Sequence, residues 1–207
     1  MPSAPPALAD SVAYPNPASL LCVRLGGLLC RGGTIAGLAA SPSDRPLDYQ
    51  AGQVEVSSLL AHVKSAIPTG IELVSRQVAN INSRNLTEPL LGLLGGVVRE
   101  ALANTLVKGI VVTHGTDTLE ETGIFLQIIC GKYAQNLGKR VILTGAMLPS
   151  NAPKADGPSN LLDAIRWAST PLENCPGGVF AVMDGRACMA MDLAKRHSTA
   201  LNAPIQS

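Results

Sequence analysis

Three short segments combine glycine with hydroxyl or acidic side chains, the residue types that can bind and attack a polar substrate. They are Gly-Gly-Thr-Ile-Ala-Gly at 32–37, Asn-Ser-Arg-Asn at 82–85 and His-Gly-Thr-Asp-Thr at 114–118. Glycine lets the backbone approach a ligand closely, and a serine or threonine hydroxyl becomes a nucleophile when a neighbouring group activates it. A site built from these loops is therefore the first hypothesis.

Each segment also has a purely structural interpretation. Threonine and aspartate after a strand commonly cap a helix, because their side chains accept hydrogen bonds from free N–H groups. His114 alone is more readily a packed, hydrogen-bonded histidine than a general base. The glycines at 32–37 suit a phosphate cradle, although neither GxxxxGK(S/T) nor GxGxxG is present. A nucleotide- or phosphate-binding α/β domain is therefore an alternative.

The hydrophobic pattern places these segments in an alternating α/β arrangement. Short apolar or β-branched runs predict strands, and apolar residues spaced three and four apart predict helices. The expected strands are 71–80, 109–113, 140–144 and 178–183, and the expected helices are 56–67, 90–102, 159–168 and one from the 114–118 segment through 129. This alternation predicts an α/β fold with a mostly parallel sheet and helices on both faces.

Two further segments are distinctive. Asp184-Gly185 predicts a hairpin turn that returns the chain over 186–191. Residues 20–30 make a poor central strand, because Gly26 and Gly27 weaken a strand interior and Arg24 would be buried.

Composition and charge narrow the classes of function. The 207 residues carry 16 Lys and Arg against 15 Asp and Glu, which excludes a polybasic nucleic-acid module and a charge-rich disordered chain. The five cysteines include no CxxC pair, which favours buried thiols over a disulfide framework or a zinc site. No apolar run reaches the roughly 18 residues that span a bilayer. We expect a cytoplasmic protein with neither nucleic-acid nor membrane partners.

Five motifs and one loop residue belong together: 32–37, Tyr49, 110–122, Leu-Thr-Gly-Ala-Met-Leu-Pro at 143–149, Ala-Asp-Gly-Pro-Ser-Asn-Leu at 155–161 and Met-Asp-Leu-Ala-Lys at 191–195. In this order they resemble the L-asparaginase/glutaminase family of amidohydrolases, most of all its bacterial two-domain type. The resemblance implies an asparaginase-like N-terminal catalytic domain at 20–195. A Pro-rich, disordered or irregular lead-in would occupy 1–19, and an interdomain linker would start at 196–207, with the family's second domain missing.

The resemblance also implies the roles of a threonine-nucleophile hydrolase. Thr34 matches the first nucleophilic threonine, and Tyr49 matches the loop tyrosine that helps activate it. Thr116 matches a second essential threonine, with Asp117 and Lys195 as its partners. A lysine desolvated beside Thr116 could act as its base, because burial lowers the pKa of an ammonium group.

Substrate-binding roles follow from the same match. Ser83 corresponds to the serine that holds the substrate carboxylate, and Asp117 to the acid that receives the α-ammonium. The backbone carbonyl of Ala146 would face the scissile amide. Backbone N–H groups of Gly33 and Thr116 are candidate donors to the developing oxyanion, since Gly-rich turns and helix N-termini present free donors.

The implied reaction converts L-asparagine to L-aspartate and ammonia through an acyl-enzyme, without a metal or cofactor. L-Glutamine is a second possible substrate, a homo-oligomer (a dimer of dimers) is expected, and family members occupy both cytoplasm and periplasm. Because the family completes its site with a second domain, we expect this chain alone to be weakly active or inactive. A non-catalytic asparagine- or aspartate-binding remnant of the family is an alternative.

Some positions depart from the family pattern. Arg31 stands where a small residue precedes Gly-Gly-Thr, Arg84 replaces a smaller polar residue beside Ser83, and Ala194 replaces a threonine before Lys195. One hypothesis is that residues 1–27 are not native family sequence.

Overall fold

The computed structural model describes residues 20–21, 26–41, 49–170, 173 and 176–193. Its main sheet has the strand order β1-β5-β2-β6-β7-β8-β9. The strands are β1 (Leu20–Leu21), β2 (Gly26–Gly32), β5 (Leu73–Ile81), β6 (Gly109–Thr113), β7 (Arg140–Thr144), β8 (Gly178–Met183) and β9 (Arg186–Met189). Neighbouring strands from β5 to β8 are parallel, while β1 and β9 pair antiparallel at the two edges. A small second sheet pairs β3 (Leu38–Ala39) with β4 (Tyr49–Gln50).

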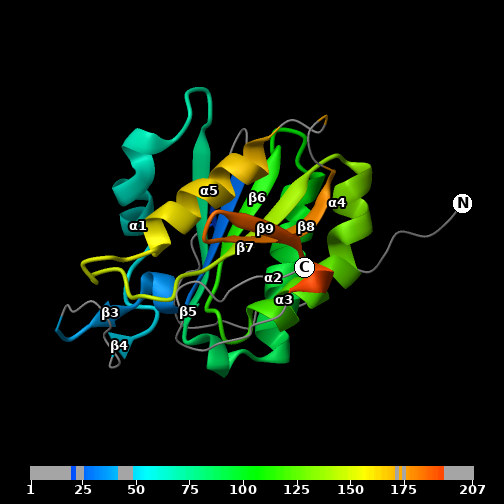
Figure 1. Ribbon diagram of the computed structural model, residues 1–207. Helices are drawn as coiled ribbons and strands as arrows, with labels where there is room; N and C mark the ends of the chain where they lie inside the picture. Colours follow the sequence, from blue (N-terminus) through cyan, green and yellow to red (C-terminus); the bar gives the residue numbers. More distant parts are fainter. Residues whose placement is uncertain (1–19, 22–25, 42–48, 171–172, 174–175, 194–207) are drawn as a thin grey trace, which may run out of the picture.

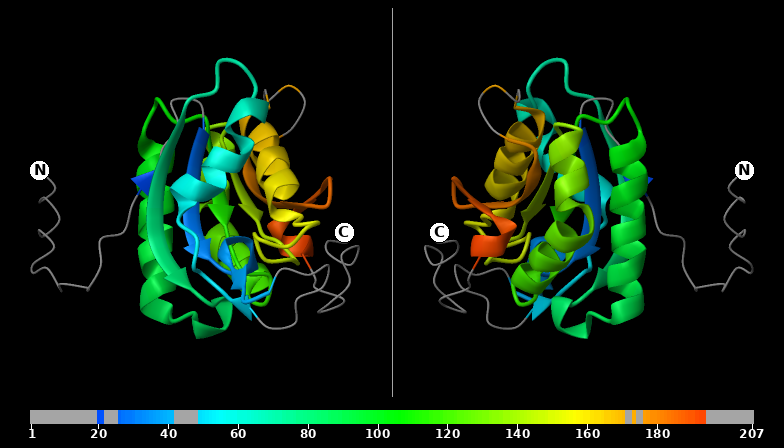
Figure 2. Two further views of the ribbon diagram at one scale, coloured as in Figure 1. Left: turned by 90° about the vertical axis from the view of Figure 1, so that its left-hand side faces the viewer. Right: turned by 90° about the vertical axis from the view of Figure 1, so that its right-hand side faces the viewer.

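Helices cover both faces of the main sheet (Figures 1 and 2). They are α1 (Val56–Val63), α2 (Glu88–Ala103), α3 (Leu119–Leu126), α4 (Lys132–Asn136) and α5 (Gly157–Ser169). One hydrophobic cluster joins α1 and α5 to the sheet, and a second joins α2, α3 and α4 to its other face. The predicted α/β class, with a mostly parallel sheet and helices on both faces, is confirmed.

The strands β6, β7 and β8 are largely apolar, because both of their faces are buried; their polar residues are Thr113, Arg140 and Thr144. In β6, Ile110 and Val112 pack in the α2–α4 cluster, whereas Val111 between them packs in the α1–α5 cluster. Every residue of β6, β7 and β8 is buried. Continuous apolar runs are typical of parallel strands covered on both sides, and the predicted bounds of these three strands match the structure.

The expectation of a poor central strand is wrong for residues 26–30. Strand β2 lies between β5 and β6, with Gly27 in register with Val74 on one side and Ile110 on the other. Backbone hydrogen bonds to two neighbouring strands fix the chain there. This tertiary pairing outweighs the low strand propensity of glycine.

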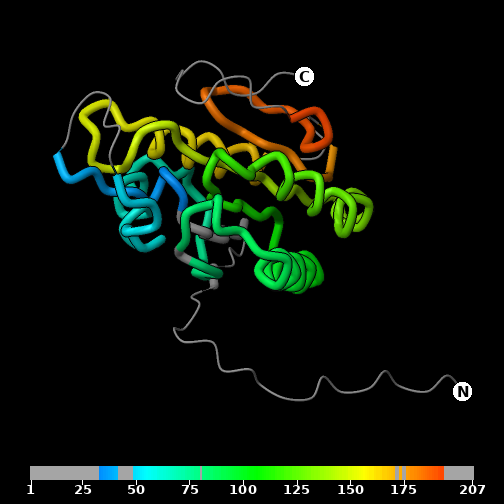
Figure 3. The backbone as a smooth tube through the Cα atoms, turned by 90° about the horizontal axis from the view of Figure 1, so that it is seen from below, coloured from blue at the N-terminus to red at the C-terminus, as the bar shows by residue number. Residues whose placement is uncertain are grey.

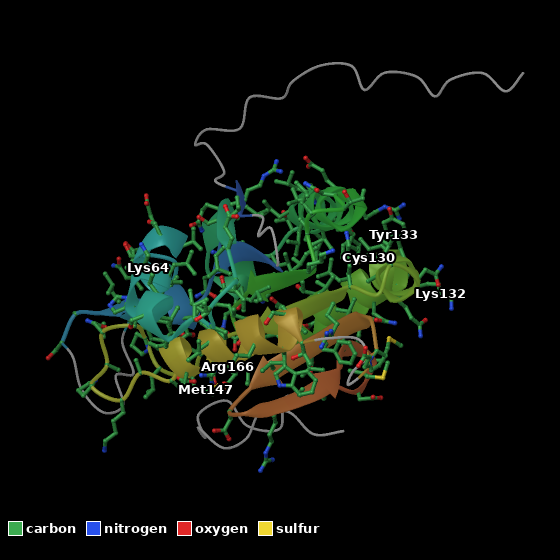
Figure 4. All side chains as sticks on the ribbon, turned by 90° about the horizontal axis from the view of Figure 1, so that it is seen from above. Lys64, Cys130, Lys132, Tyr133, Met147 and Arg166 are labelled. Carbon is green, nitrogen blue, oxygen red and sulfur yellow. The ribbon has the colours of Figure 1, made fainter. Side chains whose placement is uncertain are left out.

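The helix that follows the 114–118 segment continues beyond its predicted end at 129. Helix α3 passes into a π-helical turn, η4 (Gln127–Gly131), and then into α4. Figure 4 labels three residues of η4 and α4: Cys130, Lys132 and Tyr133. A Cβ atom on Gly95 of α2 would overlap the Ile129 side chain, so this glycine lets α2 approach η4 closely. A glycine that weakens the isolated helix thus serves the packing of two helices.

Two structural features favour a site at the lower end of the sheet in Figure 1. The parallel strands finish there, and Figure 3 views the molecule from that side. The order of the strands in the sheet also switches direction at β2, because β5 lies on one side of it and β6 on the other. In open α/β sheets, ligands bind beyond the carboxyl ends of the strands at such a switch point.

Candidate active site

Glycine contacts bring the three predicted loops together. Gly33 has φ 80°, and a Cβ atom added to it would overlap Gly115. A Cβ atom on Gly115 would in turn overlap the hydroxyl of Ser83. The loops after β2, β5 and β6 therefore touch, and two of their contact points have room only for glycine.

Thr34 and Tyr49 are brought into direct contact. Thr34 begins the 3₁₀ turn η1 (Thr34–Ala36) and is only 7% exposed. Its Oγ1 lies 2.6 Å from the hydroxyl oxygen of Tyr49, with either hydroxyl able to donate. The Tyr49 ring packs against Gly37, where an added Cβ would lie 2.8 Å from the ring atom Cδ2. A larger residue at 37 would displace the ring.

The backbone N–H of Gly33 is used within the protein and does not point freely toward a ligand, as was expected of an oxyanion donor. It donates to the carbonyl oxygen of Ile81 at 3.1 Å, and a backbone amide has one proton to give. That bond ties the start of the Thr34 turn to the end of β5. Gly33 therefore packs and anchors the Thr34 turn, and its N–H is already engaged.

Thr116, in the loop that follows β6, packs against Gly145 in the loop that follows β7. It is half-buried, and a Cβ atom on Gly145 would lie 3.2 Å from the Thr116 methyl carbon and 2.7 Å from the carbonyl oxygen of His114. Thr118 donates from its hydroxyl to the carbonyl oxygen of Ser83 at 3.0 Å. The 114–118 loop is thus held from both sides.

Asp117 forms an ion pair that sequence reasoning missed. Nε of Arg84 donates to Oδ2 of Asp117 at 2.8 Å. The hydrogen bond to Asp117, followed by the attraction of its charge, raises the pKa of the Arg84 guanidinium. Arg84 was noted as a departure from the family pattern, but its partner lies 33 positions along the chain, beyond any local spacing rule.

Ser83 is buried at the base of the site. It begins the 3₁₀ turn η3 (Ser83–Asn85), which the side chain of Asn82 caps by accepting a hydrogen bond from the Arg84 N–H at 3.1 Å. The side chain of Ser83 is 7% exposed and faces Gly115. This short turn presents Ser83 and Arg84 in succession toward the 114–118 loop.

His114 serves as a structural residue. It is 1% exposed, and its ring nitrogens contact the carbonyl oxygen of Gly115 at 2.7 Å and the Thr122 hydroxyl at 3.0 Å. A carbonyl oxygen only accepts, so Nδ1 carries a proton and donates to Gly115. The ring links the loop to the first turns of α3, as the interpretation as a packed histidine anticipated.

Two residues without a predicted role fix the loop after β7. The carboxylate of Asp156 accepts from the backbone N–H groups of Met147 and Leu148, each at 2.9 Å. Asn160, 2% exposed, donates from its side chain to the carbonyl oxygen of Gly145 at 2.9 Å. Asp156 and Asn160 are four positions apart at the start of a helix, so they lie on one helical face. This spacing is the signal by which the sequence could have identified them as a pair.

Of the two remaining predicted site residues, the structure describes Ala146 but not Lys195. Ala146 is fully buried within the loop that Asp156 holds. Lys195 lies outside the described residues, as do the segments 1–19 and 196–207. Within the described ranges no group of three or more His, Cys, Asp or Glu side chains could hold a metal ion. No helix in that part of the chain is long and apolar enough to cross a membrane.

Comparison with protein families and curated sequences gives consistent matches. A family described as "Asparaginase, N-terminal" matches residues 27–206. L-asparaginase 2 of Bacillus subtilis is 38% identical over 175 residues, covering 83% of this chain and 44% of that protein. The glutaminase-asparaginase of Acinetobacter glutaminasificans is 36% identical over 172 residues, covering 81% of this chain and 48% of that protein.

A solved structure agrees with these matches. A probable cytoplasmic L-asparaginase from Campylobacter jejuni superposes with a TM-score of 0.73 at 32% identity, covering 85% of this chain and 51% of that one. The chain thus spans about half the length of the relatives that it matches.

Proposed function

Because the chain belongs to the asparaginase family, matching its N-terminal domain over residues 27–206, we propose that it carries the primary catalytic groups of an L-asparagine amidohydrolase. The names of its relatives support this substrate class, since one is called an L-asparaginase and another a glutaminase-asparaginase. The reaction would release ammonia from the side-chain amide and leave L-aspartate.

The observation that carries the proposal is the short hydrogen bond between Thr34 and Tyr49. A neutral threonine hydroxyl is a poor nucleophile and needs a neighbour that can take its proton during attack. At 2.6 Å, the Tyr49 oxygen lies within the distance required of such a base. The position of Thr34 beyond β2, at the switch point of the sheet, supports the same role.

The second hydroxyl, that of Thr116, would complete the site from the opposite loop. The contact of Gly33 with Gly115 places the residues that follow them, Thr34 and Thr116, on adjoining loops. We assign Lys195 to Thr116 as its base, with Asp117 as partner, on the strength of the family match alone. The N–H of Thr116 is the proposed oxyanion donor, because Gly33 already donates elsewhere.

Recognition of a zwitterionic amino acid needs an acid for its ammonium group and hydrogen-bond donors for its carboxylate. Asp117, with a side chain 33% exposed, would receive the α-ammonium group, while Ser83 would donate to the α-carboxylate. The carbonyl oxygen of Ala146 would accept from the scissile amide. Its loop is held by Asp156, so this acceptor would be fixed before substrate arrives.

The proposed course has two steps. The Thr34 oxygen forms a bond to the amide carbon while its proton passes to the Tyr49 hydroxyl, which gives up its own proton toward the leaving nitrogen. The carbon–nitrogen bond then breaks and the protonated nitrogen leaves as ammonia. Water then attacks the acyl-enzyme, which returns the Thr34 hydroxyl and frees L-aspartate. We expect asparagine to be preferred over glutamine, because one methylene changes binding by about 1–3 kcal/mol.

A phosphate-binding function is less well supported. Within the 32–37 turn, the N–H groups of Gly33, Ala36 and Gly37 donate to the carbonyl oxygens of Ile81, Gly33 and Thr34 respectively. A phosphate cradle needs such donors to point at the ligand. Assembly into a homo-oligomer and a cytoplasmic location remain proposals, the latter supported by the description of the Campylobacter jejuni neighbour.

Ammonia release from L-asparagine and L-glutamine tests the function, on this chain and on one extended to the length of its relatives. We expect the extended chain to favour asparagine, this chain to be weak, and Thr34→Ala to lower the extended chain's rate by about 100-fold or more. Binding of L-aspartate without any turnover by the extended chain would instead identify a non-catalytic binding protein.

A further inference from the structure

The ion pair between Arg84 and Asp117 occupies the carboxylate that the proposed function assigns to the substrate. Nε of Arg84 lies 2.8 Å from Oδ2 of Asp117, within the range of a strong charge-assisted hydrogen bond. The α-ammonium group of an amino acid would need this same carboxylate. Two cations would therefore meet at one negative charge.

The backbone holds Arg84 in position for this contact. Asn82 accepts a hydrogen bond from the Arg84 N–H, and Thr118 donates to the carbonyl oxygen of Ser83. These bonds fix the turn η3 against the loop that carries Asp117. The backbone of Arg84 is therefore fixed in a position from which its guanidinium group reaches Asp117.

The Arg84 side chain is nevertheless free to move. It is 75% exposed, so it can turn into solvent without leaving a buried cavity behind. Exposed ion pairs contribute weakly, because water screens them and ordering long side chains has an entropic cost. Arg84 thus occupies Asp117 through an exposed contact that another cation could displace.

We propose that Arg84 is a specificity-determining residue that competes with the substrate's α-ammonium group for Asp117. This inference rests on the proposed function and deepens it. It follows that the chain binds amino acids less tightly than a variant with a neutral residue at 84. Ligands that lack the amino group leave the ion pair intact and escape this competition.

The test compares L-aspartate with succinate, which differs from it only by the missing α-ammonium group and also avoids turnover. Dissociation constants are measured by calorimetry or NMR titration on the 207-residue chain, Arg84→Gln and Arg84→Lys. Arg166→Gln is the matched control, because Arg166 forms an exposed ion pair with Asp163 on α5 (Figure 4). We expect Arg84→Gln to bind L-aspartate about two- to fivefold more tightly and succinate no more tightly. Arg84→Lys should fall between Arg84→Gln and the parent, and the control should not change.

The outcomes separate this inference from the proposed function. If L-aspartate binds but Arg84→Gln leaves its affinity unchanged or weakens it, Arg84 does not compete and only the inference is overturned. A loss of affinity for both ligands would show that Arg84 binds their carboxylates, which also overturns it. If neither the parent nor any variant binds L-aspartate, the inference is overturned, whereas the proposed function is decided separately by ammonia release from the chain extended to its relatives' length.

Discussion

The hydroxyl oxygen of Tyr49 lies 2.6 Å from Oγ1 of Thr34, although the two residues belong to different elements of the chain. Thr34 follows the central strand β2, whereas Tyr49 lies in β4 of the small second sheet. Pairing of β4 with β3 returns the chain toward η1. The small sheet thus has a positional role, since it sets the tyrosine against the candidate nucleophile.

Tyr49→Phe is expected to lower kcat for asparagine about 100-fold with little change in KM, measured by ammonia release on the chain extended to its relatives' length. The substitution keeps the ring against Gly37 but removes the oxygen that would take the proton from Thr34. Tyr133→Phe on α4 is the control, because this ring lies 5.9 Å from the Arg99 guanidinium, away from the site. Equal rates for both variants would remove Tyr49 from the mechanism.

Gly115→Ala is expected to lower the free energy of unfolding by about 1–3 kcal/mol, as measured by urea denaturation. The added methyl group would overlap the side chain of Ser83, and the loops at the site would have to separate. Gly96→Ala in α2 provides the contrast, because nothing lies within 4 Å of its added Cβ. That control should gain about 0.5–1 kcal/mol from better helix propensity. Similar effects of the two substitutions would contradict the loop contact.

Asp156→Asn is expected to destabilise the protein by about 1–3 kcal/mol and to lower its activity. The Asp156 carboxylate accepts hydrogen bonds from two backbone N–H groups and from the side-chain amide of Asn160. The single oxygen of an asparagine amide cannot replace all of these bonds. Thermal unfolding and ammonia release check the two effects. Asp163→Asn, on the same helix and in an exposed ion pair, should change both by far less. An Asp156→Asn variant as active as the parent would show that the loop after β7 needs no such anchor.

The buried thiols predict a loss of stability at alkaline pH. Burial raises the pKa of both Cys130 and Cys188 from 9.0 to about 11. Between about pH 9 and 11 the unfolded thiols have ionised while the folded ones keep their protons, so the free energy of unfolding falls as pH rises. Urea denaturation across this range measures the slope, which replacing both cysteines by alanine should flatten. An unchanged slope in that double variant would contradict the burial effect.

Local patterns predicted the elements whose burial is uniform. The three strands β6, β7 and β8 are largely apolar runs covered on both faces, and the turn Asp184-Gly185 has positive φ angles of 52° and 67°. The prediction failed where contacts distant in the sequence decide the structure. Strand β2 forms because β5 and β6 pair with it, and the helix after the 114–118 segment continues through Gly131, where a glycine does not end it.

The same distinction applies to the site. Glycine and hydroxyl residues in short motifs identified the loops that come together at Gly33, Ser83 and Gly115. The pairing of Arg84 with Asp117 could not be derived from spacing, because it joins loops that follow β5 and β6. Asp156 belongs to a motif that the sequence displays, but the sequence does not say which groups it binds. The fold shows that its carboxylate accepts a hydrogen bond from the Met147 N–H in the loop after β7.

Trapping the acyl-enzyme tests the central claim most directly. The extended chain is mixed with L-asparagine, quenched in acid within the first turnover and digested, and the peptides are analysed by mass spectrometry. We predict an aspartyl adduct on the peptide that contains Thr34, absent from Thr34→Ala. An adduct that maps to Thr116, or ammonia release at the parent rate by Thr34→Ala, would contradict the assignment of Thr34 as the nucleophile.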